Sequence, residues 1–407
     1  MRTKFDSSAI VHTALMNDNT INNYRIAITM KEEVDAQRLQ RAVDLVAGRY
    51  PMIICRVANG ANWIYSEPLP TVAVKEDDGR ILKSLDRHNI FQQAVNIMYS
   101  GNKVIFEAFH SVADGFGAFT FLNGLLREYI EMDSGNYEEP YLGNAPEIEM
   151  ECGFTKYGTA KGTPENIVSI KNAFQFPVLD YKKPLRFTTV HMNLRRAKNM
   201  AKANQWTLNE LMVAMVYSAV FKLDNTDGKD VVFSVPVNMR NKFESRSLRN
   251  FSYLTKTSLR KGPDTATTDA IVREVRSQLH RQNNKEYLYK ALSQVKNRFD
   301  GPLTAKMPLW FKYMLIRMGV AFGFDKSCMT VSNVGNLAYM LPDIHEHITA
   351  VDTMLSPRRK SAYNCCISSL GEFLNITFTH SEENDPLLNA IGGWLAENNI
   401  EYTMQSH

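Results

Sequence analysis

The stretch FEAFHSVADGFGAF, residues 106–119, decides the fold of this chain. An apolar run ends at His110, and Asp114 and Gly115 follow before a second apolar pattern begins. At the end of a strand the imidazole is held by a rigid element while it faces the space beyond the sheet edge. Neutral imidazole accepts a proton near neutral pH, so His110 is a candidate general base. Glycines at 115 and 117 are expected to let another backbone pass close by.

Asp114 has two possible roles in this stretch. Its carboxylate either orients the imidazole of His110 or turns away and ties the loop to a cation elsewhere. A third reading makes His110 a core or turn histidine and Asp114 the N-cap of the following helix.

Composition places the chain among ordinary soluble globular proteins. With 407 residues it exceeds one typical core, so two domains are expected. A net charge of +4 is too slight to predict nucleic-acid binding. Five cysteines without a CxxC pair favour a reduced, cytoplasmic protein. The apolar stretch 311–324 is interrupted by Lys312 and Arg317 and is shorter than the roughly 20 residues of a membrane span, so no integral membrane segment is expected.

Periodicity predicts strands and helices mixed throughout two halves of similar size. Strands are expected at 24–30, 52–57, 94–100, 103–109, 185–194, 230–237, 250–259, 328–334, 363–370 and 373–380. Helices are expected at 34–50, 116–132, 194–205, 208–223, 265–282 and 386–399, with a capping box at Thr207 and Glu210. Residues 134–184 lack periodicity and are predicted to connect the halves. The pattern indicates two α/β sandwich-like domains, 1–175 and 176–407, with a ligand site between them.

Four segments are similar to one known family. HSVADGFGAFTFLNGLL at 110–126 resembles the active-site segment of the chloramphenicol acetyltransferase-like superfamily, which includes condensation domains of nonribosomal peptide synthetases, plant-type HxxxD acyltransferases and bacterial alcohol acyltransferases. SVPVNMRNKF at 234–243 resembles the family's P-V-x-x-R stretch, and TVSNVGNL at 330–337 resembles its S-N-x-G strand. Residues 38–57 are similar to its opening helix and strand. A histidine one quarter along the chain is typical of the two-domain members, which have a central active-site channel.

Two differences from other members of the family indicate which branch this chain resembles. Phe109 stands where peptide-forming condensation domains have the first histidine of HHxxxDG, and the DFGWG segment of plant members is absent. Both features favour the bacterial alcohol or small-molecule acyltransferase branch.

The resemblance implies a mechanism without a covalent acyl-enzyme. His110 would act as general base on a hydroxyl, or less favourably an amine, which attacks the thioester of an acyl-CoA or an acyl carrier protein. The absence of a GxSxG elbow agrees with this implication. Asp114 would point away from the substrate and pair with an arginine, for which Arg240 is the candidate. The alternative for Arg240 is a solvated loop charge.

Other residues are weaker candidates for contacts with substrates. Thr330 and Ser332 share one strand face and, with Asn333, could stabilise the oxyanion or contact the acceptor. The alternative is that the two hydroxyls only supply hydrogen bonds to backbone groups at a sheet edge. Lys256, Arg260 and Arg358 could contact the phosphates of CoA, or be solvated surface charges. His345 and His347 lack a third ligand, so no metal is expected.

Three functions therefore remain open from the sequence. The first is acyl transfer from a thioester co-substrate to a small acceptor, without a permanently bound cofactor. The second is a condensation enzyme that depends on a separate carrier protein. The third is a non-catalytic binding protein with the same fold. We expect a monomer in each case.

Overall fold

The computed structural model describes residues 2–17, 22–82, 85, 88–134, 137–140, 142–180, 183–321, 326–357, 362–381 and 385–406. The strands are β1 (Thr3–Lys4), β2 (Asn23–Met30), β3 (Cys55–Asn59), β4 (Ile64–Pro68), β5 (Val74–Glu76), β6 (Val95–Ser100), β7 (Lys103–Phe109), β8 (Arg186–Asn193), β9 (Asp230–Asn238), β10 (Ser252–Arg260), β11 (Met329–Asn336), β12 (Ile348–Leu355), β13 (Tyr363–Leu370), β14 (Phe373–His380) and β15 (Tyr402–Ser406). The α-helices are α1 (Ala9–Leu15), α2 (Ala36–Ala47), α3 (Gly115–Glu131), α4 (Glu147–Met150), α5 (Gly153–Tyr157), α6 (Leu194–Ala203), α7 (Leu208–Val220), α8 (Arg240–Phe243), α9 (Thr268–Gln282), α10 (Lys285–Asp300), α11 (Leu309–Ala321), α12 (Leu337–Met340) and α13 (Pro386–Glu397).

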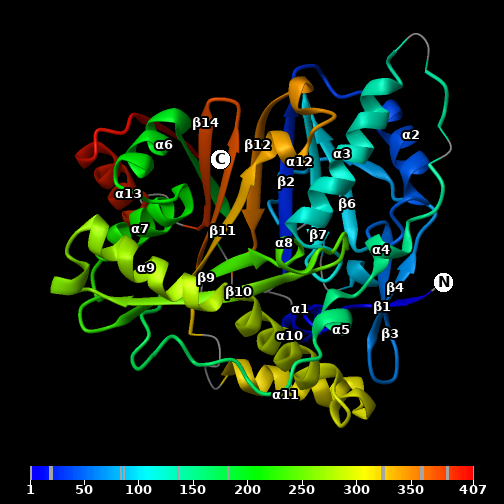
Figure 1. Cartoon of the computed structure of the whole chain (residues 1–407). Helices are drawn as coiled ribbons and strands as arrows, with labels where there is room; N and C mark the ends of the chain where they lie inside the picture. The colour runs from blue at the N-terminus through cyan, green and yellow to red at the C-terminus, as the bar shows by residue number, and fades with distance from the viewer. Residues whose placement is uncertain are drawn as a thin grey trace.

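The described strands form one sheet in each half and a small third sheet. The first sheet has the order β12-β2-β7-β6-β5, and the second sheet has the order β10-β9-β11-β13-β14-β8-β15. Strands β1, β4 and β3 form the small sheet near the N-terminus. Figure 1 shows α2 and α3 beside the first sheet and α6, α7 and α13 beside the second. The predicted α/β sandwich of two domains is the observed architecture.

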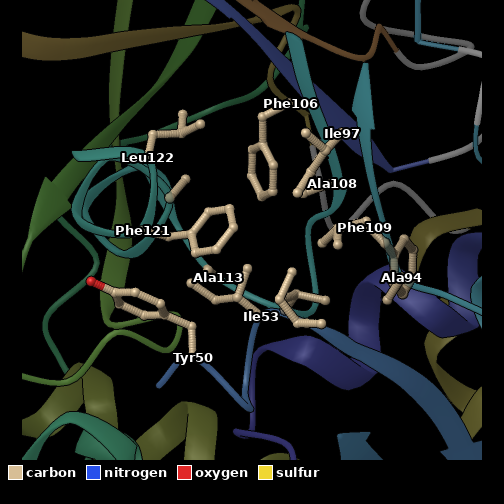
Figure 2. Packing of buried hydrophobic residues seen from close by; sticks show 14 of the residues in the cluster. Tyr50, Ile53, Ala94, Ile97, Phe106, Ala108, Phe109, Ala113, Phe121 and Leu122 are labelled. Carbon is tan, nitrogen blue, oxygen red and sulfur yellow. The ribbon is translucent and has the colours of Figure 1, made fainter. Parts of the chain in front are cut away.

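The core of the first half fixes the end of β7, where His110 begins. Phe106 of β7 points toward Phe121 of α3, with ring centroids 5.3 Å apart (Figure 2). Phe121 also meets the ring of Tyr50 edge-on at 5.3 Å. These large buried rings hold strand β7 and helix α3 in one relative position, because tilted and edge-on aromatic pairs pack closely and exclude water. The turn between β7 and α3 is therefore anchored at both ends.

The core of the second half forms around α7. Thr207 caps this helix by accepting a hydrogen bond from the Glu210 N–H at 3.2 Å, and the Glu210 carboxylate accepts from the Thr207 N–H at 2.8 Å. This is the predicted capping box. Helix α7 then packs between α9, α13 and the seven-stranded sheet.

The division of the chain at residue 175 does not coincide with the division of the sheets. Strand β12 pairs antiparallel with β2, so a strand from the second half completes the first sheet. Its Ile348 and Val351 are buried in the core of the first half. The sequence analysis predicted no strand at 348–355, so it did not foresee this exchange.

Two further segments differ from the predictions. The strand expected at 52–57 begins only at Cys55, because Ile53 and Ile54 donate their N–H groups to the Tyr50 carbonyl in a turn. The connection 134–184 contains the short helices α4 and α5. His345–His347 forms a single 3-10 turn. Among the described residues, no helix combines the length and apolar character needed to cross a bilayer.

Candidate active site

His110 lies directly after β7, between the first sheet and helix α1. Its N–H donates to the Asn22 carbonyl at 2.8 Å, and its side chain is half-buried. The imidazole stacks on the ring of His12 from α1, with centroids 4.6 Å apart and planes at 3°. The ring of Tyr24 from β2 meets it edge-on at 5.1 Å. The ring is thus confined between two aromatic neighbours but is not sealed from solvent.

A side chain from the second half determines the tautomer of His110. Asn250 lies just before β10, and its Nδ2 donates to the Ser111 carbonyl at 3.0 Å and faces an Asp6 carboxylate oxygen at 3.4 Å. Both of those groups are acceptors, so they fix which end of the amide is nitrogen. The Asn250 Oδ1 therefore faces the His110 Nδ1, at 3.3 Å. An amide oxygen only accepts, so Nδ1 holds the proton and the lone pair is on Nε2.

Asp114 and Arg240 form a buried pair with two nearly parallel hydrogen bonds. The Arg240 Nη1 donates to Oδ2 at 2.9 Å, and Nη2 donates to Oδ1 at 3.0 Å. The side chains are 7% and 3% exposed. The structure thus places Arg240, predicted as the partner of Asp114, against its carboxylate, while Asp114 also caps α3 by accepting from the Gly117 N–H at 3.3 Å.

Further hydrogen bonds satisfy both members of this pair. The Asp114 Oδ2 accepts from the Phe251 N–H at 2.8 Å. The Arg240 Nε donates to the Ser247 carbonyl at 2.6 Å, and its Nη2 also donates to the Arg249 carbonyl at 2.5 Å. A buried charge pair is tolerated when its remaining donors and acceptors are met in this way. The pair fixes the chain from 247 to 251, and therefore Asn250, against the turn that holds His110.

The close backbone contact in this turn occurs at Gly117 and not at Gly115. A Cβ on Gly117 would lie 1.9 Å from the Leu248 carbonyl oxygen, whereas a Cβ on Gly115 would meet nothing within 4 Å. The expectation that both glycines admit a neighbouring backbone is therefore wrong for Gly115. Its position as the first residue of α3 does not require glycine.

The second sheet opens between β9 and β11. Strand β11 pairs with β9 only at Met329 and Thr330, after which the two strands separate. A hollow of about 330 Å³ lies there. It is lined by residues of β9, β11, α7 and α9: Asn209, Val235, Pro236, Val237, Leu279, Asn283, Asn333 and Gly335. The lining contains three amide side chains and no ionisable group.

The predicted oxyanion residues are located around this opening. Thr330 donates its N–H to the Asn364 side chain at 3.2 Å, and Asn333 donates to Asn209 at 3.1 Å. Ser332 lies on the same face of β11 as Thr330, opposite the buried Val331. Asn333 lines the hollow, whereas an oxyanion role for Thr330 or Ser332 stays a prediction.

Two of the three predicted phosphate contacts, Lys256 and Arg260, lie on β10. Arg260 lies at the far end of β10 from Asn250, and its Nη2 donates to the Asp230 carboxylate at 2.8 Å. Lys256 is half-buried in the middle of the same strand. Arg358 lies outside the described residues. Arg260 thus joins the ends of β9 and β10 through Asp230, and a phosphate contact of Lys256 or Arg260 stays a prediction.

The buried cysteines have the character of core residues. Burial raises the pKa of the Cys55 and Cys366 thiols to about 12, and it raises the pKa of the Cys365 thiol in the same direction. A thiolate is the nucleophilic form, so these groups are unsuited to covalent catalysis near neutral pH. The described residues contain no group of three or more metal-ligating side chains.

The sequence analysis missed the three side chains that surround the His110 ring. His12, Tyr24 and Asn250 are distant in sequence from the HxxxDG stretch, and none belongs to a motif. The Tyr24 hydroxyl is buried without a hydrogen-bond partner among the described residues. Its pKa is raised by burial and by the nearby Asp114 charge, so the hydroxyl stays protonated. An alternating strand pattern predicts that Tyr24 is in β2 but not what its hydroxyl faces.

Comparisons with known proteins identify the architecture. No family model and no curated protein matches the sequence. Solved structures do match over nearly the whole chain. The first condensation domain of the CDA synthetase has a TM-score of 0.65 at 15% identity, covering 97% of this chain and 95% of that one. TRI101 from F. graminearum, complexed with coenzyme A and T-2 mycotoxin, has 0.65 at 11% identity, covering 99% of each chain. Polyketide synthase associated protein 5 from Mycobacterium tuberculosis has 0.64 at 13% identity, covering 96% of this chain and 97% of that one. The chain therefore shares the fold of these condensation-domain and TRI101 structures.

Proposed function

We propose that this chain is an acyltransferase that moves an acyl group from a thioester, with acyl-CoA as donor, to the hydroxyl of a small molecule. The observation that supports this most directly is the hydrogen bond between His110 Nδ1 and Asn250 Oδ1, at 3.3 Å. This hydrogen bond leaves the lone pair on Nε2, and with this atom the half-buried imidazole can accept a proton. An amine acceptor would follow the same chemistry.

The reaction requires one proton acceptor and no covalent intermediate. Nε2 takes the proton of the acceptor hydroxyl while its oxygen attacks the thioester carbonyl. The tetrahedral intermediate collapses, the C–S bond breaks, and the thiolate takes the proton from the imidazolium to leave as a free thiol. Asn250 keeps the imidazole in the required tautomer, and the Asp114–Arg240 pair holds Asn250 in place. The protein is regenerated unchanged.

We place the pantetheine arm of the donor in the hollow between β9 and β11. The arm is a narrow, uncharged chain with two amide groups, and the hollow offers the side-chain amides of Asn209, Asn283 and Asn333. On β9 the hollow is lined by Val235, Pro236 and Val237, and this strand leads to Arg240. TRI101, which has the same fold, was solved with coenzyme A. A carrier protein could present the same arm, which keeps the carrier-dependent condensation reaction as the second candidate.

A thiol-release assay tests the proposal. The His110→Ala variant is expected to lose about 10²–10⁴-fold in turnover with acyl-CoA and alcohol panels, because that is the usual contribution of a general base. Exposed His280 at the end of α9 provides the control, and His280→Ala should retain activity. Wild-type turnover by His110→Ala would contradict the mechanism. Acyl-CoA binding without thiol release from the unmodified protein would favour a non-catalytic role, and activity on acyl carrier proteins alone would favour condensation.

A further inference from the structure

Helix α11 exposes an apolar face and buries a lysine. Trp310, Met314 and Met318 are 68%, 39% and 45% exposed. Their spacing of four residues places them along one side of the helix. Leu303, just before the helix, is 83% exposed. Figure 1 shows α11 at the lower edge of the molecule, away from both large sheets.

The opposite side of α11 packs on the first half. Leu309, Lys312 and Ile316 are buried, and the Lys312 Nζ donates to the Asn62 carbonyl at 2.8 Å above the ring of Trp63. A surface helix of a globular protein normally does the reverse, with lysine outside and large apolar residues inside. The position of Lys312 therefore shows that the orientation of α11 is fixed by specific contacts, and the exposed apolar side is left for a partner.

The charges around this face indicate the kind of partner. Between Gly301 and Ala321 the charged residues are Lys306, Lys312 and Arg317, all of them basic. Lys306 and Arg317 are exposed, so they border the apolar face with positive charge. A tryptophan with neighbouring leucine and methionine, edged by basic residues, is the composition of a helix that lies in the interface of an anionic membrane. A two-fold contact between copies of α11 would instead bring like charges together.

We propose that the exposed face of α11 is a docking surface for anionic lipid bilayers. The helix has 13 residues and lies parallel to the membrane plane, with Trp310, Met314 and Met318 at the level of the acyl chains. The helix also contacts α1, because the Arg317 Nε at the border of this face donates to the Ala14 carbonyl at 2.7 Å. Helix α1 also provides His12, which stacks on His110. Docking therefore brings the His110 cluster close to the bilayer surface. The binding itself does not depend on the proposed reaction.

Vesicle binding tests this proposal with the whole chain. The protein is mixed with large unilamellar vesicles of pure phosphatidylcholine or of phosphatidylcholine with one quarter phosphatidylglycerol, and the bound fraction is measured by sedimentation. We expect binding to the anionic vesicles and a blue shift of Trp310 emission. Trp63 and Trp394 are buried, and the half-buried Trp206 packs against the core of the second half, away from the docking face. Trp310→Phe should remove the shift. Lys306→Gln should weaken binding about fivefold, since each basic residue near such a surface contributes about 1 kcal/mol.

A matched pair of double variants makes the result specific. Met314→Glu/Met318→Glu puts two charges on the docking face and should reduce binding at least tenfold. Val178→Glu/Phe373→Glu puts two charges on other exposed apolar positions, 60% and 59% exposed, and should bind like the unmodified protein. Equal binding by both doubles, or no sedimentation of the unmodified protein with anionic vesicles, would overturn the proposal. So would a lipid-free dimer in analytical ultracentrifugation that Met314→Glu/Met318→Glu dissociates.

Discussion

Asp114 and Arg240 are 126 residues apart in the chain, yet their side chains meet through two hydrogen bonds of 2.9 and 3.0 Å in the interior. Asp114 is the N-cap of α3 in the first half, and Arg240 is the first residue of α8 in the second half. The pair therefore joins the two halves beside the candidate base.

Removing the charge of Asp114 should destabilise the fold and the site together. Asp114→Asn leaves the Arg240 guanidinium buried without its counter-charge, and the free energy of unfolding should fall by about 3–5 kcal/mol. Urea denaturation measures this change. Glu397→Gln removes an exposed ion pair with Lys222 and should cost less than about 1 kcal/mol. Equal effects of the two substitutions would show that the Asp114–Arg240 pair has no special structural role.

Gly117 and Gly115 should respond differently to the same added methyl group. Gly117→Ala forces a Cβ against the Leu248 carbonyl oxygen and should destabilise the protein by about 1–3 kcal/mol or more. Gly115→Ala has open space and should be neutral or stabilise by up to about 1 kcal/mol through the unfolded state. Thermal and urea unfolding compare the two variants, and a larger loss for Gly115→Ala would refute the contact.

Asn250 should act as a positioning residue for His110. Asn250→Ala removes the acceptor for Nδ1–H, so the ring is expected to shift toward the Nε2–H tautomer, in which the base nitrogen is occupied. Turnover should fall by roughly ten- to a hundredfold with little change in KM, because the variant loses only part of the rate that the general base contributes. Nitrogen-15 NMR of labelled histidine reads the tautomer directly. An unchanged tautomer with reduced turnover would mean that Asn250 acts only on the fold.

Alkylation of the native protein should label Cys152 far faster than the other cysteines. Cys152 is half-buried, whereas the other four are buried. Burial raises the pKa of Cys55 and Cys366 to about 12, so at pH 8 their thiolate fractions are very small. Mass spectrometry after brief iodoacetamide treatment identifies the labelled residue. Cys366→Ala should keep acyl-transfer activity, because the proposed reaction has no thiol nucleophile; loss of activity without loss of stability would contradict it.

The sequence by itself determined the local elements and the position of the candidate base. Alternating residues predicted β2, and apolar runs predicted β6 and β7. The capping box predicted the start of α7, and the apolar run followed by HxxxDG placed His110 at a strand end. These features depend on neighbours within a few residues, so their physical causes can be read along the chain. The resemblance to a known family added Arg240 as the expected partner of Asp114.

Only the tertiary structure decided what surrounds that base. The pairing of β12 with β2, the stacking of His12 on His110, the amide of Asn250 at Nδ1 and the carbonyl of Leu248 against Gly117 all join residues far apart in sequence. Each contact arises because buried polar groups need hydrogen-bond partners and apolar faces must be covered. Many distant residues of the same type could make the same contact, so the sequence alone does not identify the one that does. The identity of the partner that is used follows from the packing of the whole chain.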